Sequence, residues 1–181
     1  MIIKGKKVIL RPVQLSDAER FVKWFNDPKV NKFMNYRNFT LAFEKQYIIN
    51  RLKNKAKDNF HFCIDTKEGV HIGSCSLESI SKIHNRATFG IIIGDKNFWD
   101  QGLGSEAAKL IIDYGFRKLK LHRIDLDVYA YNPRAIKVYK RLGFKKEGEK
   151  REHAFWQGKY YNALMMSILD REWEKRNKLG K

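Results

Sequence analysis

The sequence predicts an α+β fold with a central, mixed but mostly antiparallel sheet of about seven strands and about four helices. Three strand-like runs, at 60–65, 70–80 and 86–94, follow one another with turn residues between them, which is typical of an antiparallel meander. A strand, helix, strand order occupies 89–128, and a hairpin around Gln157-Gly158 closes the chain. A single domain over 1–181 is expected, because a chain of this length can bury one sizeable core.

The first sixty residues are predicted to contain one strand and two helices. Alternation over 8–13 indicates the strand, and Ser16 or Asp17 can cap a helix that ends at Asn26-Asp27-Pro28. A polar and aromatic loop is expected over 29–39, and a second helix is expected to begin at Thr40. The apolar face of that helix is predicted to consist of Phe43, Tyr47, Ile48 and Leu52.

The later elements follow from periodicity and turn residues. Residues 89–93 are apolar without alternation, which predicts a central strand covered on both faces. Helical spacing continues from Leu103 to Tyr114, and a strand follows over 124–128, whose Asp125 and Asp127 are expected to meet Lys or Arg. Asn132-Pro133 starts a helix that ends at Gly143. The closing hairpin pairs 149–156 with 159–169, and 171–181 is expected to be a frayed, basic C-terminal tail.

Composition restricts the classes of function. The net charge of +17 favours an anionic partner or cofactor, but the basic residues are spread along the chain and match no RNA-binding motif, so specific nucleic-acid binding is not expected. No segment approaches the roughly 20 apolar residues that span a bilayer, so the expected location is cytoplasmic, away from membranes. Cys63 and Cys75 lie in strand-like runs without metal-ligand or CxxC spacing, which predicts two buried free thiols and no metal site.

The residues between the apolar strand and the following helix predict an anion site. They are Gln101, Gly102, Leu103, Gly104 and Ser105. The two glycines lack Cβ atoms, so backbone N–H groups can close on a phosphate, and the helix start adds further donors and a positive dipole end. The same glycines also fit an ordinary tight turn. A dinucleotide-binding βαβ unit is not favoured, because the preceding strand belongs to a meander.

A second signal begins at Asn132, where Asn132-Pro133-Arg134-Ala135 leads into a helix that contains Tyr139. Tyr139 is seven residues beyond Asn132, so two helical turns return it to nearly the same face, about 10 Å along the axis. One ligand could therefore contact both side chains.

With these motifs the chain resembles the GNAT superfamily of acetyl-coenzyme A dependent N-acetyltransferases. The resemblance is strongest to the branch that contains ribosomal-protein N-terminal, polyamine and amino-sugar acetyltransferases. It spans nearly the whole chain, from Leu10-Arg11-Pro12 to the closing Gly158-Lys159-Tyr160-Tyr161. One position departs from the family's pyrophosphate motif: Trp99 stands where the family has Gln or Arg. The backbone donors of 101–105 remain, and they supply most of the anion binding in such a turn.

The resemblance implies acetyl-CoA as co-substrate, with its pyrophosphate on 101–105. It also implies splayed middle strands, with the backbone groups of Ile91, Ile92 and Ile93 offered to the pantetheine arm. Asn132 would contact the cofactor, cap its helix, or do both. Tyr139 matches the family position whose phenol protonates the coenzyme A thiolate, although a Tyr that only packs on the sheet fits as well. Glu78 is the first choice for the general base, against a merely solvated strand carboxylate.

The acceptor is expected to be a small amine such as an amino sugar, or a protein N-terminal amine. Polyamine acetyltransferases of the branch place acidic side chains where this chain has Ser76 and Thr88, and a strongly basic chain attracts a polycation poorly. The alternatives are a non-catalytic coenzyme A-binding module or a basic protein associated with ribosomes or RNA. The sequence leaves the oligomeric state open, a dimer included.

Overall fold

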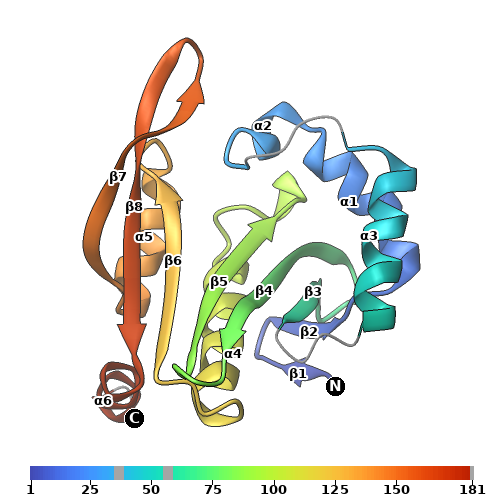
Figure 1. Cartoon of the computed structure of the whole chain (residues 1–181). Helices are drawn as coiled ribbons and strands as arrows, with labels where there is room; N and C mark the ends of the chain where they lie inside the picture. Colours follow the sequence, from blue (N-terminus) through green and yellow to red (C-terminus); the bar gives the residue numbers. More distant parts are fainter. Residues whose placement is uncertain (35–38, 55–58, 180–181) are drawn as a thin grey trace. The chain divides into compact units, whose positions relative to one another are not determined.

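The computed structural model describes residues 1–34, 39–54 and 59–179, and these residues include an eight-stranded mixed sheet and six helices (Figure 1). The strands pair in the order β1-β2-β3-β4-β5-β6-β8-β7. The α+β class and the mostly antiparallel sheet are confirmed, since β5 and β6 pair in parallel and the other registered neighbours are antiparallel. The strands are β1 (Ile3–Lys4), β2 (Val8–Pro12), β3 (Phe60–Thr66), β4 (His71–Ser81), β5 (Arg86–Ile93), β6 (Arg123–Tyr129), β7 (Lys145–Trp156) and β8 (Lys159–Leu169).

The helices are α1 (Ala18–Phe25), α2 (Pro28–Asn31), α3 (Leu41–Asn54), α4 (Leu103–Arg117), α5 (Pro133–Leu142) and α6 (Asp170–Leu179), with short 3₁₀ turns η1 (Leu15–Asp17) and η2 (Lys96–Phe98). The elements that the sequence did not predict are β1, α2 and α6. Part of the predicted loop over 29–39 is thus helical, and its residues 35–38 lie outside the described residues. Within the described parts of the chain, no helix is long and apolar enough to cross a membrane.

The chain divides into two compact units, which are described separately. The first contains Met1–Ser76 and Ile91–Leu110, and the second contains Leu77–Gly90 and Ile111–Lys181. Both β4 and β5 run through the two units. In the first unit α1 packs its apolar face against α3 and β3, because Ala18, Phe21 and Trp24 recur at helical spacing and bury against Ile48 and Cys63.

The face that α3 buries is not the predicted one. Ile48 is buried, but Phe43, Tyr47 and Leu52 are 59%, 44% and 51% exposed, while Glu44 is buried. Helical spacing defines possible faces without deciding which one meets the core, and packing against α1 selects the stripe that contains Glu44 and Ile48. Burial raises the pKa of the Glu44 carboxyl, with the charge of Arg51 opposing the shift.

Residues 171–179 belong to helix α6, whereas the sequence predicted a frayed tail over 171–181; residues 180 and 181 lie outside the described residues. In the second unit, Trp173 of α6 is 2% exposed, its ring centroid lies 6.1 Å from that of Phe116, and its Nε1–H donates to Asp113 Oδ1 at 3.1 Å. One large apolar side chain in a polar segment therefore holds α6 against α4.

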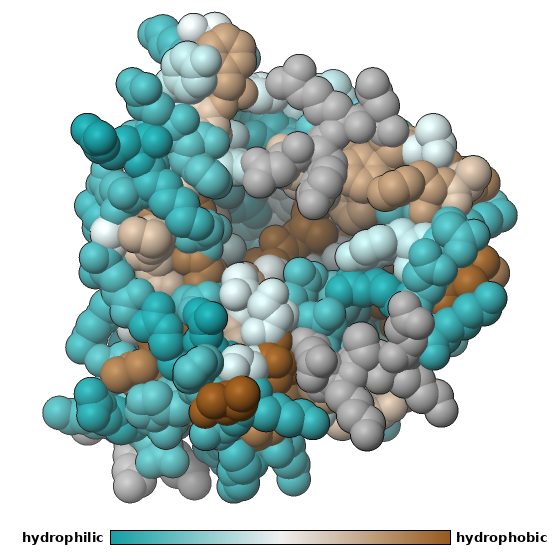
Figure 2. Space-filling view, viewed as in Figure 1, coloured by the Kyte–Doolittle hydropathy of each residue, from teal (hydrophilic) through white to brown (hydrophobic). Residues whose placement is uncertain are grey.

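The closing hairpin is confirmed, although β7 begins at Lys145 and not at 149. Its turn residues Gln157 and Gly158 have φ of 48° and 78°, the left-handed pair that a two-residue hairpin turn requires. Phe155 and Tyr160 face each other near the tip with ring centroids 4.9 Å apart, and both are exposed. Figure 2 accordingly shows brown and pale side chains at this tip, above a mostly teal surface over β7 and β8.

Candidate functional site

The predicted phosphate turn lies in the first unit, between η2 and α4. Asp100 and Gly102 have φ of 62° and 79°, and a Cβ built at Gly102 would meet nothing within 4 Å. The first intrahelical bond runs from Glu106 N–H to the Gly102 carbonyl at 3.1 Å, so the N–H groups of the preceding turn have no intrahelical acceptor. The space at Gly102 and these donors are compatible with a phosphate group, and the role of this turn in binding one stays a prediction.

Neighbouring residues fix this turn in place. Gln101 Nε2 donates to the Asn97 carbonyl at 2.8 Å, and Glu106 Oε1 accepts from Lys7 N–H at 2.9 Å. A Cβ at Gly104 would lie 3.1 Å from Ile93 Cγ1, which is tight enough that a larger side chain must displace its neighbour. Leu103 is buried and Ser105 is half-buried, so the Leu103 side chain anchors the turn.

The backbone groups at the end of β5 are less available to a ligand than the sequence predicted. Ile91, Ile92 and Ile93 are half-buried in the first unit, and the Ile93 carbonyl accepts from Trp99 Nε1–H at 2.8 Å. Trp99, which departs from the family motif, therefore braces the strand end. Pairing of β5 with β6 is registered only from Arg86–Arg123 to Thr88–Asp125 in the described sheet. The role of Ile91 to Ile93 toward a pantetheine arm stays a prediction.

Helix α5 carries the second predicted group in the other unit. Asn132 Oδ1 accepts from Ala135 N–H at 3.1 Å, so the capping role is confirmed, and Pro133 occupies the first helical position. Gly143 ends the helix with φ of 101°. The Oδ1 atom is committed to the cap, which leaves the Asn132 amide N–H groups as the donors that a ligand would use.

Tyr139 lies in an aromatic environment on the same helix. It is 8% exposed, and its ring centroid lies 6.1 Å from that of Phe89 and 5.9 Å from that of Phe144. Burial disfavours the phenolate and raises the pKa of Tyr139 to about 12. The phenol thus remains protonated at neutral pH and can serve as a proton donor.

Tyr139 and Glu78 lie on opposite faces of the sheet in the second unit. A Cβ at Gly115 of α4 would lie 2.9 Å from Ile124 and 3.0 Å from Leu77, so both residues face α4. Ala87 pairs with Ile124, which places Phe89, two residues on, on that face with Tyr139.

Strand alternation places Glu78, next to Leu77, on the other face. Glu78 is half-buried. The same alternation puts the odd-numbered residues of β6 on the Glu78 face. There Asp125 pairs with Arg123 at 3.3 Å and Asp127 pairs with Lys150, which confirms the expected basic partners.

The sequence analysis missed an aromatic cluster on the face of the sheet that carries Glu78. The Tyr131 ring is stacked on Tyr129 at 5.2 Å and lies 6.4 Å from Trp156 and 4.9 Å from Tyr161, measured between centroids. Burial and the neighbouring phenols raise the pKa of Tyr131 to about 12. The signal in the sequence was the density of aromatics on both sides of Asn132-Pro133 and in the hairpin, but only strand pairing brings them together.

The first unit also groups three residues with metal-ligand chemistry, Asp17, Cys63 and His71, whose ligand atoms lie within 4.8 Å of one another. Arg11 lies beside these three residues, and its guanidinium donates to both carboxylate oxygens of Asp17 at 2.8 Å. Asp17 also accepts from Gln14 N–H at 2.8 Å, so its side chain does not cap α1 as expected.

Burial raises the pKa of both buried free thiols, Cys63 and Cys75. The Cys63 thiol therefore stays protonated and donates to Asp17. Because guanidinium, amide and thiol donors already satisfy the carboxylate, this group reads as a structural network under α1.

Comparison with known proteins places the chain in a family. The family described as Acetyltransferase (GNAT) domain matches residues 7–145. The chain is 36% identical over 172 residues to the uncharacterized N-acetyltransferase p20 of Bacillus licheniformis, covering 93% of this chain and 96% of that protein. It is 39% identical over 171 residues to spermidine N(1)-acetyltransferase of Escherichia coli K12, covering 94% and 90%.

The fold agrees with that of a solved spermidine N-acetyltransferase. The crystal structure of spermidine N-acetyltransferase from Vibrio cholerae, solved in complex with CoA and spermine, superimposes with a TM-score of 0.87 at 24% identity and covers 94% of this chain and 99% of that one. A family match over most of the chain, two relatives at 36% and 39% identity that are named as N-acetyltransferases, and a shared fold lead to one conclusion. The chain belongs to the GNAT family of acetyl-CoA-dependent N-acetyltransferases.

Proposed function

We propose that this chain transfers the acetyl group of acetyl-CoA directly to the primary amine of a small acceptor, with Tyr139 as the acid. The observation that carries the proposal is the buried side chain of Tyr139, which packs against Phe89 and Phe144 on the helix that Asn132 caps. The amine nitrogen forms a bond to the thioester carbonyl carbon, the carbon–sulfur bond breaks, and Tyr139 gives a proton to the departing sulfur. The turn at Gln101–Ser105 would hold the pyrophosphate.

The two faces of the second unit suggest how the proton transfers are divided. Tyr139 is on the face that packs against α4, and Glu78 is on the opposite face. An acceptor amine that approaches from the Glu78 face would lose its proton to that carboxylate, directly or through water, while the thiolate gains one from Tyr139.

The acceptor is proposed to be a small amine such as an amino sugar, or a peptide N-terminal amine. The carboxylates that face it from β6 are paired with Arg123 and Lys150, so they offer little free negative charge to a polycation. The half-buried rings of Tyr131 and Trp156 would instead contact an apolar or planar part of the acceptor. Spermidine is the second candidate, favoured by the name of the relative that is 39% identical.

A thiol-release assay with a panel of amines tests the proposal. Purified protein, acetyl-CoA and each of an amino sugar, a nucleotide-linked amino sugar, a short peptide and spermidine would be mixed, and free CoA thiol measured. Turnover with an amino sugar or peptide above that with spermidine supports the first candidate, and the reverse order supports the second. Cofactor binding without turnover on any amine would instead favour a non-catalytic coenzyme A-binding module.

Trp156→Leu tests the acceptor side of the site. It should raise the KM for the best acceptor several-fold and leave the KM for acetyl-CoA unchanged, because only the acceptor would touch that ring. Phe155→Leu, an exposed neighbour on the opposite side of the hairpin, is the matched control. An equal effect of the two substitutions would count against the assignment of Trp156 to the acceptor.

A further inference from the structure

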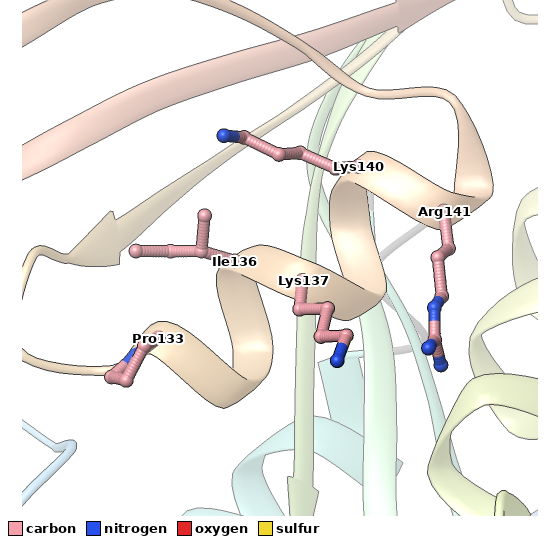
Figure 3. Close-up of a pocket in the computed structure, with 5 residues that line it drawn as sticks. All are labelled: Pro133, Ile136, Lys137, Lys140 and Arg141. Atoms are coloured by element: carbon pink, nitrogen blue, oxygen red, sulfur yellow. The ribbon is translucent and has the colours of Figure 1, made fainter.

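The aromatic cluster of the second unit shares no residue with the pocket on α5. Figure 3 shows the side chains around that pocket, whose volume is ≈ 480 Å³, and all of them belong to the helix itself: Pro133, Ile136, Lys137, Lys140 and Arg141. The cluster consists instead of residues from the end of β6 and from the closing hairpin: Tyr129, Tyr131, Trp156 and Tyr161. The hairpin strands β7 and β8 therefore shape this cluster, independently of the α5 pocket.

The pairing of β7 with β8 is interrupted by a bulge. Three residues of β7, 151–153, lie opposite the single residue Asn162 of β8. The flanking pairs are Lys150 with Ala163 and Ala154 with Tyr161. A bulge bends its strand, strengthens the local twist and redirects side chains. Figure 1 shows the two strands twisting about each other toward the hairpin tip.

His153, the last residue of the bulge, lies at the edge of the aromatic cluster. Its ring centroid is 6.5 Å from that of Tyr129, which is within the range of aromatic contacts. The His153 side chain is exposed, so a ligand can reach it. A neutral imidazole has one nitrogen that donates and one that accepts, so His153 adds hydrogen-bonding capacity at this edge.

The bulge requires an unfavourable backbone conformation. Glu152, in its middle, has φ of 51°, a left-handed value that residues with a Cβ atom rarely adopt. Such a conformation persists only when surrounding contacts hold it. The contact here is a hydrogen bond from Glu152 N–H to Asn162 Oδ1 at 2.9 Å. The side chain of Asn162 therefore stabilises the bulge directly.

The orientation of the Asn162 amide is set from both sides. Asn162 Nδ2 donates to Glu149 Oε2 at 2.7 Å. Hydrogen bonds from Lys146 and Asn162 lower the pKa of the Glu149 carboxyl, so at neutral pH this group is ionised and can only accept. The N–H of Glu152 can only donate. An amide, with one acceptor and one donor group, matches both partners, whereas a carboxylate or an apolar side chain does not.

The main chain of Asn162 extends this support to the tyrosines. Its carbonyl accepts from Ala130 N–H at 2.9 Å. Ala130 is the residue between Tyr129 and Tyr131, whose rings stack 5.2 Å apart. One residue of β8 thus holds the bulge through its side chain and the end of β6 through its carbonyl.

A bulge on an edge strand such as β7 also discourages pairing with another chain. That purpose gives no reason for an amide fixed from two sides, or for an exposed histidine turned toward the tyrosines. We propose that Asn162 is a positioning residue for the acceptor: its amide holds the bulge that keeps His153 beside Tyr129, where the imidazole hydrogen-bonds to an oxygen of the acceptor. This inference rests on the proposed function, because it assumes that the aromatic cluster contacts the acceptor.

The chemistry of this contact selects among amines. An amino sugar has hydroxyl oxygens near its amine, and a peptide has carbonyl oxygens, so either can pair with the imidazole of His153. Spermidine contains no oxygen and gains nothing from that contact. Asn162 therefore favours oxygen-bearing amines over polyamines.

Steady-state kinetics of Asn162→Ala test the selective role. The KM for an amino sugar or peptide should rise by about 2- to 10-fold, the factor that one hydrogen bond contributes, while the KM values for spermidine and acetyl-CoA stay unchanged. His153→Ala should have the same effect, and the double variant should be no worse than either single one, because Asn162 acts through His153. The control, Asn177→Ala, removes another half-buried amide of this unit, which donates to the Trp173 carbonyl at 3.0 Å.

An exchange of donor and acceptor provides a rescue. Asn162→Asp sets two carboxylates against each other and should raise the acceptor KM as Asn162→Ala does. Addition of Glu149→Gln turns the partner into a donor and should restore the wild-type KM. Nuclear Overhauser effects between the ring protons of His153 and Tyr129 report the position of His153 without any need for turnover. They should disappear in Asn162→Ala and persist in Asn177→Ala.

The outcomes separate the inference from the function on which it rests. Loss of the ring contact together with a selective rise in KM supports it. A ring contact that survives in Asn162→Ala, or additive effects of the Asn162 and His153 substitutions, overturns it while acetyl transfer stands. An equal rise in KM for spermidine, or acetylation of spermidine alone, overturns the selection of oxygen-bearing amines. A protein that acetylates no amine refutes the proposed function itself, and with it the role of Asn162 toward an acceptor.

Discussion

Replacement of Tyr139 by Phe removes the phenolic hydroxyl, and with it the transferable proton, and keeps the aromatic ring. With a pKa of about 12, Tyr139 is ionised in roughly one molecule in 10⁴ at pH 8, so the donor is almost always loaded. Loss of a positioned proton donor lowers turnover by roughly 10² to 10⁴-fold, which corresponds to about 3 to 5 kcal/mol of transition-state stabilisation. We expect Tyr139→Phe to fall in this range when the chemical step limits the rate.

The same substitution should change stability little. The Tyr139 ring contacts Phe89 and Phe144, and both contacts survive in Phe. Among the described residues, none accepts from or donates to the hydroxyl. The free energy of unfolding should therefore change by less than about 1 kcal/mol, so a loss of activity cannot be attributed to unfolding.

The assay measures kcat and both KM values by thiol release, with pre-steady-state acetyl transfer to confirm that chemistry limits turnover. The control is Tyr114→Phe, which removes a hydroxyl from a half-buried tyrosine of α4 in the same unit. A fall in kcat with unchanged KM for acetyl-CoA supports the acid role. Unchanged kcat would refute it and leave water as the proton source, whereas a weaker affinity for acetyl-CoA at constant kcat would make Tyr139 a binding residue.

Three further predictions address the donor turn, pH and the C-terminal helix. Gly104→Val should weaken acetyl-CoA binding more than 10-fold, because its Cβ enters the turn 3.1 Å from Ile93 Cγ1, and calorimetry that finds unchanged affinity would return the turn to a purely structural role. The ionised Asp17 should contribute about 2 kcal/mol above pH 4. Burial raises the pKa of Asp17, but hydrogen bonds from Arg11, Gln14 and Cys63 outweigh it and hold that pKa at about 2, against 3.8 in the unfolded chain, so this stability disappears as pH falls from about 4 to 2. Urea titrations of wild type and Asp17→Asn across that window should converge, and a constant difference would contradict the pairing. Trp173→Ala should destabilise the fold by about 3 to 5 kcal/mol, whereas a change below 1 kcal/mol would mean that α6 frays as the sequence suggested.

Local signals account for most of the correct assignments. Alternation and turn residues located the strands, and the Asn132-Pro133 and Gly143 pair fixed both ends of α5, because caps depend on a few adjacent residues. These local signals gave the wrong buried face for α3, where either of two faces could have packed against the core. The apolar residues of α3 formed a second stripe, and packing against α1 chose the stripe with Glu44 and Ile48.

The candidate site likewise contains some features that follow from neighbouring residues and others that depend on tertiary contacts. The Gly102 turn and the helical phase of Asn132 and Tyr139 are properties of neighbouring residues, so they could be read from the order of amino acids. The aromatic cluster around Tyr131 could not, since its members come from the end of β6 and from a hairpin some 25 residues later, joined by strand register. The same holds for the pairing of Asp17 with Arg11, where a residue expected to cap a helix is turned toward a half-buried guanidinium.

The sequence by itself thus determined the family, acetyl-CoA as the acetyl donor and the order of most secondary elements, because each depends on residue types at short, fixed spacings. The role of Tyr139 as proton donor stays a prediction. Only the tertiary structure decided which face each strand residue occupies. That placement puts Tyr139 and Glu78 on opposite sides of the sheet in the second unit. The physical reason is that faces and charge neighbours are set by packing between distant segments, and a one-residue change of register would exchange them.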